Sequence, residues 1–147
     1  MNLLTGEFKN TLDDKGRVSI PARLREKLSG NILWLTKGYN NKNVWLLSPE
    51  HWEKVSDNIM KDTSILTNDR SHIIRRIIGA AQEGEIDNAG RIAIPQSLRD
   101  FAGLSRECVI LGTGKDIEIW DAERYQMYLE ANEEGLMDKL GSIDLFS

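Results

Sequence analysis

The sequence is poor in the features that mark secreted and membrane proteins. Its 147 residues contain one cysteine, Cys108, which cannot form an internal disulfide and so fits a reducing cytoplasm. No apolar run approaches the roughly 18 residues that a membrane helix needs. The first residues lack the basic and apolar segments of a signal peptide. We therefore expect a cytoplasmic protein that has no membrane partner.

Catalytic constellations are also scarce. His51 and His72 lack the spacing of paired metal ligands, and no serine lies in a G-x-S-x-G sequence. The sequence Gly-Thr-Gly-Lys at residues 112–115 lacks the spacing of a phosphate-binding loop, so it is interpreted as a hairpin turn. We predict that the chain is not an enzyme and uses no metal or cofactor.

Positive charge is in deficit over the whole chain, whose net charge of −4 argues on its face against a nucleic-acid partner. The distribution of charge matters more than this sum. Residues 121–147 carry seven acidic and two basic side chains, whereas residues 9–25 carry five basic and two acidic ones. The first segment is therefore suited to binding phosphate groups.

One stretch of the sequence occurs twice. Residues 13–25 and 87–99 align without a gap at a separation of 74 positions, and seven of the 13 positions are identical. The shared residues are, in order, Asp, Gly, Arg, Ile, Pro, Leu and Arg. A repeat of this kind indicates two structural units, each of which needs the other. The second copy has lost the basic excess, because residues 83–99 hold two basic and three acidic side chains.

Hydrophobic periodicity, turn residues and prolines predict the same order of elements in both units: strand, turn, strand, helix, strand, turn, strand, helix. The first unit has strands at 6–12, 17–20, 32–36 and 44–47, with helices at 21–28 and 49–60. A helix at 69–81 links it to a second unit with a strand ending at 86, strands at 91–94, 108–111 and 117–120, and helices at 95–102 and from 121. An acidic, mobile tail is expected from about residue 132. The fold class is thus mostly β with short helices (α+β), and the small sheets of the two units must pair with each other.

The bulky and sulfur-containing side chains are expected in the core. The four tryptophans, at 34, 45, 52 and 120, lie at strand and helix positions that should be buried, so core packing is favoured over base stacking. Cys108 has apolar neighbours and is interpreted as a small core residue. The arginines at 70, 75 and 76 are interpreted as ordinary solvated surface.

The acidic residue that opens each repeated stretch leaves two interpretations open. Asp13 and Arg17, and likewise Asp87 and Arg91, lie four positions apart across a glycine-containing turn. The carboxylate would cap the turn and the arginine would fold back on it, or the pair would serve a binding function. The residues predicted to structure the turns are Asp13, Gly16, Asp87, Gly90 and Arg91.

For the first copy a binding role is favoured. Lys15 and Arg17 lie in the turn, and Arg23 and Arg25 follow on the next helix. Arginine bonds guanine bidentately or clamps a phosphate, and the major groove admits a two-stranded β-ribbon. We predict that Lys15, Arg17, Arg23 and Arg25 contact double-stranded DNA.

The duplicated Asp-x-x-Gly-Arg-[Val/Ile]-x-Ile-Pro stretch makes the chain resemble the MraZ family of bacterial transcriptional regulators. The resemblance extends to the Leu-Arg after each proline, to the linking helix, and to the Ser-Pro-Glu and Asp-Ala-Glu helix starts. Lys15 and Arg17 match the basic first turn of that family, while Ala89 stands in the second turn where Lys15 stands in the first. These matches extend over nearly the whole chain.

The resemblance implies a fold and a function. Each repeat would be an AbrB-like swapped-hairpin unit, and the two would form a pseudo-two-fold, double-psi-type β-barrel with the helices outside. The expected domains are a DNA-binding repeat at 7–50, linking helices at 51–80, a second repeat at 81–124, and a C-terminal helix with an acidic tail at 125–147. The chain would assemble into a homo-oligomeric ring in the cytoplasm, associated with the nucleoid. It would bind direct repeats in the promoter of the division and cell-wall gene cluster, usually as a repressor.

A second function class stays open beside DNA binding. The chain could be a non-catalytic structural or protein-interaction module that uses the shared barrel only to oligomerise. The overall acidity of the sequence is the feature that favours this alternative.

Overall fold

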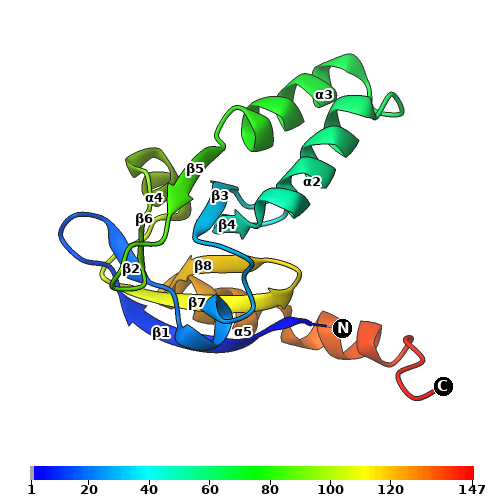
Figure 1. The fold of residues 1–147 in the computed structure, drawn as a ribbon. Coiled ribbons are helices and arrows are strands. Elements are labelled where there is room, and N and C mark those ends of the chain that lie inside the picture. Colours follow the sequence, from blue (N-terminus) through cyan, green and yellow to red (C-terminus); the bar gives the residue numbers. More distant parts are fainter. Residues whose placement is uncertain (1) are drawn as a thin grey trace.

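The computed structural model describes residues 2–147 as an α+β protein, which confirms the α+β part of the predicted fold class. The strands are β1 (Leu4–Thr11), β2 (Arg17–Ser19), β3 (Ile32–Lys37), β4 (Val44–Leu47), β5 (Gln82–Glu85), β6 (Arg91–Ala93), β7 (Glu107–Gly114) and β8 (Ile117–Asp121). The helices are α1 (Ala22–Arg25), α2 (Pro49–Lys61), α3 (Thr67–Ile73), the π-helical segment η1 (Ile74–Ile78), α4 (Gln96–Ala102) and α5 (Ala122–Leu140). The expectation of a mostly β chain with short helices is not met, because α2 has 13 residues and α5 has 19. Figure 1 shows α2 and α3 projecting from the sheets as a helical hairpin, while α5 extends from the opposite part of the molecule.

Strand pairing joins the two repeats to each other. Six antiparallel strands follow the order β1-β7-β8-β4-β3-β5, and β2 pairs separately with β6. The first strand of each repeat therefore pairs with the third strand of the other repeat, and the fourth strands β4 and β8 are neighbours. Neither repeat contains all the partners that its own strands need. The strands form two hydrogen-bonded sheets, and the closed barrel and the AbrB-like assignment stay predictions.

The short β2–β6 pair contributes the side chains of Val18 and Ile92 to the core that the two repeats share. Val18 is directly opposite Ile92, the residue that occupies the same place in the other repeat. Both side chains are fully buried, as are Ile20 and Ile94 two residues later. Burying each such side chain contributes roughly 1.5–3 kcal/mol relative to leaving it exposed. The apolar positions of the duplicated stretch are thus among the residues that join the two repeats.

The strand registers correct the alignment of the later strands by one residue. Thr11 of β1 pairs with Glu107, and its counterpart Glu85 of β5 pairs with Ile32. Ile32 therefore corresponds to Glu107, whereas the predicted strands 32–36 and 108–111, aligned at their first residues, would match Ile32 with Cys108. Burial explains the difference, because in the observed register Leu33 and Cys108 are both buried.

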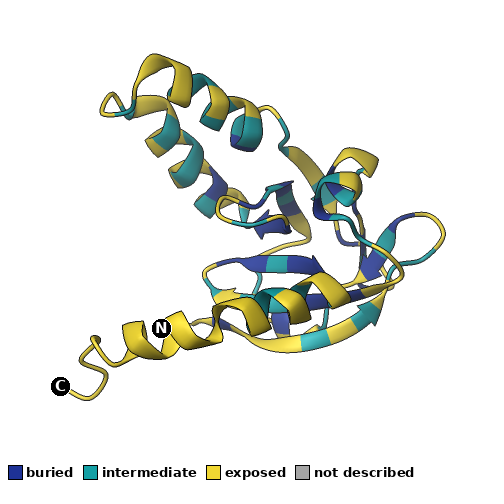
Figure 2. Cartoon of the chain, turned by 180° about the vertical axis from the view of Figure 1, so that it is seen from behind, coloured by how far each residue is buried: buried dark blue, intermediate teal, exposed yellow. Residues whose placement is uncertain are grey.

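The linking helices cover a second, smaller core. Trp45, Trp52 and Ile77 are buried there, and Trp34 stacks on Trp52 with ring centroids 5.3 Å apart. Trp120 is also buried, so the predicted core role of the tryptophans is confirmed for three of them, while Trp34 is half-buried. Figure 2 shows that burial decreases along the helical hairpin toward its tip.

Three helices differ from their predicted bounds. Helix α1 covers only Ala22–Arg25, because the chain continues to Leu28 in tighter i→i+3 turns instead of α-helical ones. The linking helix predicted at 69–81 begins earlier, at Thr67, and changes to π-helix at Ile74. The tail expected to be mobile from residue 132 is helical to Leu140, although its residues from 131 onward are exposed. The residues there favour a helix by their own propensity, so the helix continues although these residues contact no core.

No helix within residues 2–147 is long and apolar enough to cross a membrane.

Gly16 and Gly90, in the two equivalent turns, are required for a steric reason, which can be tested at Gly16. Gly16 has a φ of +76°, and a Cβ built on it would lie 2.6 Å from Cζ of Arg99. We expect Gly16→Ala to lower the free energy of unfolding by about 1–2 kcal/mol, because an L-residue is strained in this conformation. Urea denaturation measures the change. Gly30→Ala is the matched control, because no heavy atom lies within 4 Å of its Cβ position. Equal stability of the two variants would contradict the steric explanation.

Cys108 is a core residue, as predicted. Burial, with a smaller contribution from the charge of Asp121, raises the pKa of its thiol to about 11. The thiol is therefore neutral at pH 8, and only the thiolate reacts with a disulfide reagent. We expect labelling of the native protein at pH 8 to be far slower than labelling in denaturant. Fast labelling of the native protein would show that the site opens without global unfolding.

Candidate nucleic-acid interface

The first turn, residues 13–16, is organised by one carboxylate. Oδ1 of Asp13 accepts hydrogen bonds from the backbone amides of Lys15 at 2.9 Å and Arg17 at 2.8 Å. Its Oδ2 accepts a bond from Nε of Arg17, also at 2.8 Å. The backbone amide of Arg17 is the main cause that lowers the pKa of Asp13, so the carboxylate stays ionised at neutral pH. Lys15 is left exposed at the tip of the turn.

The second turn, residues 87–90, repeats this geometry. Oδ1 of Asp87 accepts from the amides of Ala89 and Arg91, both at 2.9 Å, and Oδ2 accepts from Nε of Arg91 at 3.3 Å. The amide of Arg91 is likewise the main cause of the lowered pKa of Asp87. The structural interpretation therefore applies to both turns. In each, the carboxylate caps the turn and the arginine folds back onto it.

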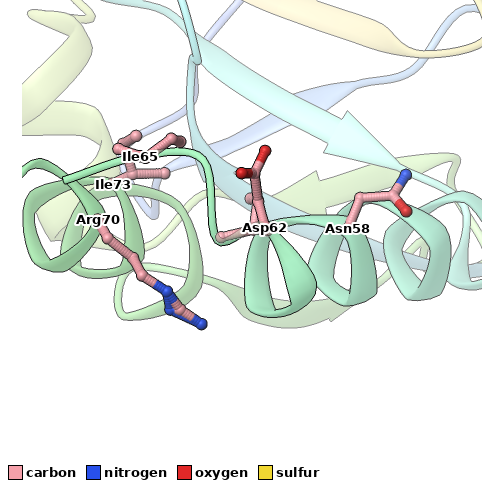
Figure 3. A pocket seen from close by; sticks show the side chains of 6 residues that line it. Asn58, Asp62, Ile65, Arg70 and Ile73 are labelled. Carbon is pink, nitrogen blue, oxygen red and sulfur yellow. The ribbon is translucent and has the colours of Figure 1, made fainter. Parts of the chain in front are cut away.

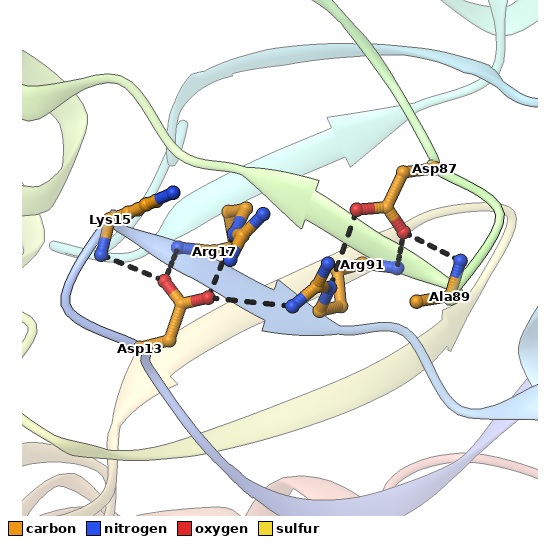
Figure 4. A network of polar contacts seen from close by, with 6 residues as sticks. All are labelled: Asp13, Lys15, Arg17, Asp87, Ala89 and Arg91. Carbon is orange, nitrogen blue, oxygen red and sulfur yellow. Dashed lines mark hydrogen bonds and ion pairs between the residues drawn. The ribbon is translucent and has the colours of Figure 1, made fainter.

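The structure brings the two arginines onto one surface (Figure 4). Arg17 and Ser19 of β2 pair with Ala93 and Arg91 of β6, and all four side chains lie on the side of the ribbon opposite the buried Val18. Nη1 of Arg91 also lies 3.9 Å from Oδ2 of Asp13. Spacing along the sequence did not indicate this proximity, because it depends on the register of β2 against β6. We call Arg17, Ser19, Arg91 and Ala93 the outer ribbon face.

The four residues predicted to bind DNA do not all lie at the first turn. Nε of Arg25 donates to the carbonyl oxygen of Ile20 at 2.8 Å, and its guanidinium lies against Gly90 of the second turn. Arg99 makes the equivalent bond and lies against Gly16 of the first turn. The two repeats thus exchange these arginines. Arg23 is exposed on α1.

Repeat 2 also contributes a residue beside the first turn that the sequence did not indicate. The carbonyl oxygen of Arg106 accepts a hydrogen bond from the amide of Leu12 at 2.7 Å, and its side chain is exposed. Together with Asp13, Asp14 and Ser105, Arg106 lines an open hollow of about 600 Å³ beside the turn. Only the β1–β7 pairing could have revealed this neighbour.

A smaller cleft of about 170 Å³ lies in the helical hairpin. Its lining consists of three isoleucines, Asn58, Asp62 and Arg70 (Figure 3). Arg70 donates to the carbonyl oxygen of Met60 at 2.5 Å. Asp62 bonds Ser64 and likewise takes part in local structure. No group of three potential metal ligands was found within residues 2–147. The ribbon and the first turn are the place where arginines of both repeats converge on one surface.

Comparison with known proteins agrees with this architecture of two repeats. A family model described as "MraZ protein" and as antitoxin-like matches residues 3–74 and 77–145. A protein of Treponema denticola named "Transcriptional regulator MraZ" is 48% identical over 88% of this chain and 90% of its own length. A protein of the same name from Treponema pallidum (strain Nichols) is 40% identical over 90% of this chain and 88% of its own.

A more distant relative of the same name, from Alkaliphilus metalliredigens, is 36% identical over 86% of both chains. A solution structure of a protein from Pyrococcus horikoshii is 18% identical, with a TM-score of 0.33 over 81% of this chain and 89% of that one. The family model and the curated relatives cover most of the chain, including both turns. The chain therefore belongs to the MraZ family.

Proposed function

We propose that this protein is a sequence-specific, DNA-binding transcriptional regulator without catalytic activity. The observation that carries the proposal is the outer ribbon face, where Arg17 and Arg91 lie together beside the exposed Lys15. A two-stranded ribbon fits the major groove, and arginine is suited to bond both guanine and phosphate. Relatives that are 48% and 40% identical are named transcriptional regulators, which supports the same role here.

Within this proposal the residues have distinct tasks. Lys15 and Arg17 contact DNA, and Arg91 joins them from the second turn. Nε of Arg17 is bonded to Asp13, so this pair sets the direction in which the rest of the guanidinium points. Arg23 provides a phosphate contact from α1. Arg25 supports the second turn through its bond to Ile20 and contributes charge at that end of the ribbon.

The proposal includes the arrangement of the repeats and their assembly. The exchange of strands between the repeats supports an AbrB-like swapped-hairpin fold with pseudo-two-fold symmetry. One small cationic patch on a chain of net charge −4 binds DNA weakly. A homo-oligomeric ring presents several such patches to direct promoter repeats, and the linked contacts raise the overall affinity. Repression of the division and cell-wall gene cluster is the regulatory role that we propose for this complex.

The alternative is an oligomeric interaction module that does not bind DNA. The acidic helix α5, whose residues 131–140 are exposed, is the observation that favours it. Absence of any retarded promoter fragment, with the intact oligomer shown by light scattering, would decide for this alternative.

Arg17 provides the direct test of DNA binding. We expect Arg17→Ala to lose retardation of the DNA upstream of the protein's own gene in a gel-shift assay, because the central cation of the outer ribbon face is removed. Arg17→Lys keeps the charge and is expected to retain weak binding while losing the preference for the promoter over unrelated DNA. Arg75→Ala is the charge-matched control, since this exposed arginine lies on η1. Wild-type binding by Arg17→Ala, with an unchanged circular dichroism spectrum, would refute the assignment.

The exposed Lys15 provides a second test, based on salt. The logarithm of the binding constant falls with the logarithm of salt concentration by about 0.9 for each phosphate contact. Lys15→Ala is therefore expected to make this slope shallower by about 0.9 for each copy of the chain that contacts DNA. Fluorescence anisotropy over a salt series measures the slope. A slope equal to that of the wild type would show that Lys15 does not neutralise a phosphate.

A further inference from the structure

We propose that Arg106 is a phosphate-contacting residue of the DNA interface, supplied to the first turn by the second repeat. This inference rests on the proposed function, because it names a further residue of the same site. Arg106 lies outside the duplicated stretch and 93 positions after Asp13 in the chain. Its place beside the first turn follows from the fold alone.

The position of Arg106 is fixed by the sheet. Thr11 pairs with Glu107 at the end of the β1–β7 ladder, and the next amide, that of Leu12, donates to the carbonyl oxygen of Arg106 at 2.7 Å. Asp13 follows immediately, and its carboxylate begins the first turn. The backbone of Arg106 is therefore anchored where the turn begins, while its exposed side chain lines the adjacent hollow.

The second turn has the same anchor with a different side chain. There the amide of Ile86 donates to the carbonyl oxygen of Asn31 at 2.8 Å, next to the paired residues Ile32 and Glu85. Asn31 is thus the counterpart of Arg106, and it has no charge. Because the backbone contact is the same in both places, the fold does not require an arginine at 106.

Two positions that carry a cation beside the first turn therefore carry a neutral residue beside the second turn. Lys15 corresponds to Ala89 and Arg106 to Asn31, although one residue of each pair lies in each repeat. The first turn combines Lys15 from its own repeat with Arg106 from the other. A phosphate beside the turn would meet both of these long, exposed side chains.

The nearby carboxylates leave this cationic surface effective. Asp13 is already bonded to Arg17, and Arg91 lies 3.9 Å from it. Asp14, which is exposed, is the remaining acid that lines the hollow. None of the ion pairs within residues 2–147 includes Arg106, so its guanidinium can donate to a phosphate in this hollow.

The test exchanges Arg106 for its own counterpart. Arg106→Asn keeps the backbone bond to Leu12, so we expect thermal unfolding to be unchanged. Promoter binding of the full-length protein is measured by fluorescence anisotropy over a salt series. For each bound copy of the chain, we expect the binding constant at 0.1 M salt to fall about eightfold. The slope of its logarithm against the logarithm of salt concentration should become shallower by about 0.9 for each bound copy. Arg75→Ala removes the same charge from η1 and is the control.

The outcomes separate this inference from the proposed function. If the wild type and Arg106→Asn bind with the same affinity and slope, Arg106 makes no phosphate contact while the function stands. If Arg106→Asn and Arg75→Ala weaken binding equally, the effect is one of net charge, and the contact is refuted. If the wild-type protein binds no promoter DNA, both proposals fail. Loss confined to Arg106→Asn supports the contact.

Discussion

The antiparallel pairing of β2 with β6 is the interaction on which the rest of the molecule depends. It places Val18 against Ile92 in the core and directs Arg17 and Arg91 to the opposite side. The alternation of side chains along a strand thus places an apolar core residue and a cationic surface residue next to each other in each repeat. A slip of one residue would bury the arginines and expose the two apolar side chains, so the register is strongly specified.

Much of the fold could be predicted because its local signals are strong. Ser48 with Pro49 begins α2, and its hydroxyl accepts the amide of His51. Asp121 begins α5 in the same way through the amide of Arg124. Turn glycines and the alternation of apolar residues located most strands. Helix α1 was overestimated because Leu24 and Leu28 have helical spacing even though the chain leaves the helix between them.

Local sequence patterns did not show which strands pair with each other or which turn each arginine lies against. Lys15, Arg17 and Arg25 are close in sequence, yet Arg25 lies against Gly90 of the other turn. Arg91 and Arg17 are far apart in sequence and share one surface. Arg106 has no repeat motif around it. Each of these positions follows from contacts between the repeats, and such contacts depend on register and on which strand is exchanged. The sequence therefore indicated the residue types of the candidate site, whereas which residues lie together there depends on contacts between the repeats.

The exchange of strands also constrains when the protein acquires its shape during synthesis. β1 (Leu4–Thr11) leaves the ribosome well before its hydrogen-bonding partner β7 (Glu107–Gly114) is made. The amide of Leu12 likewise waits for the carbonyl of Arg106. Contacts this distant in sequence are slow to form, because a long loop must close before they stabilise anything. A partly made chain therefore holds the duplicated stretch without its scaffold, and the cationic surface is completed only when translation has passed the second repeat.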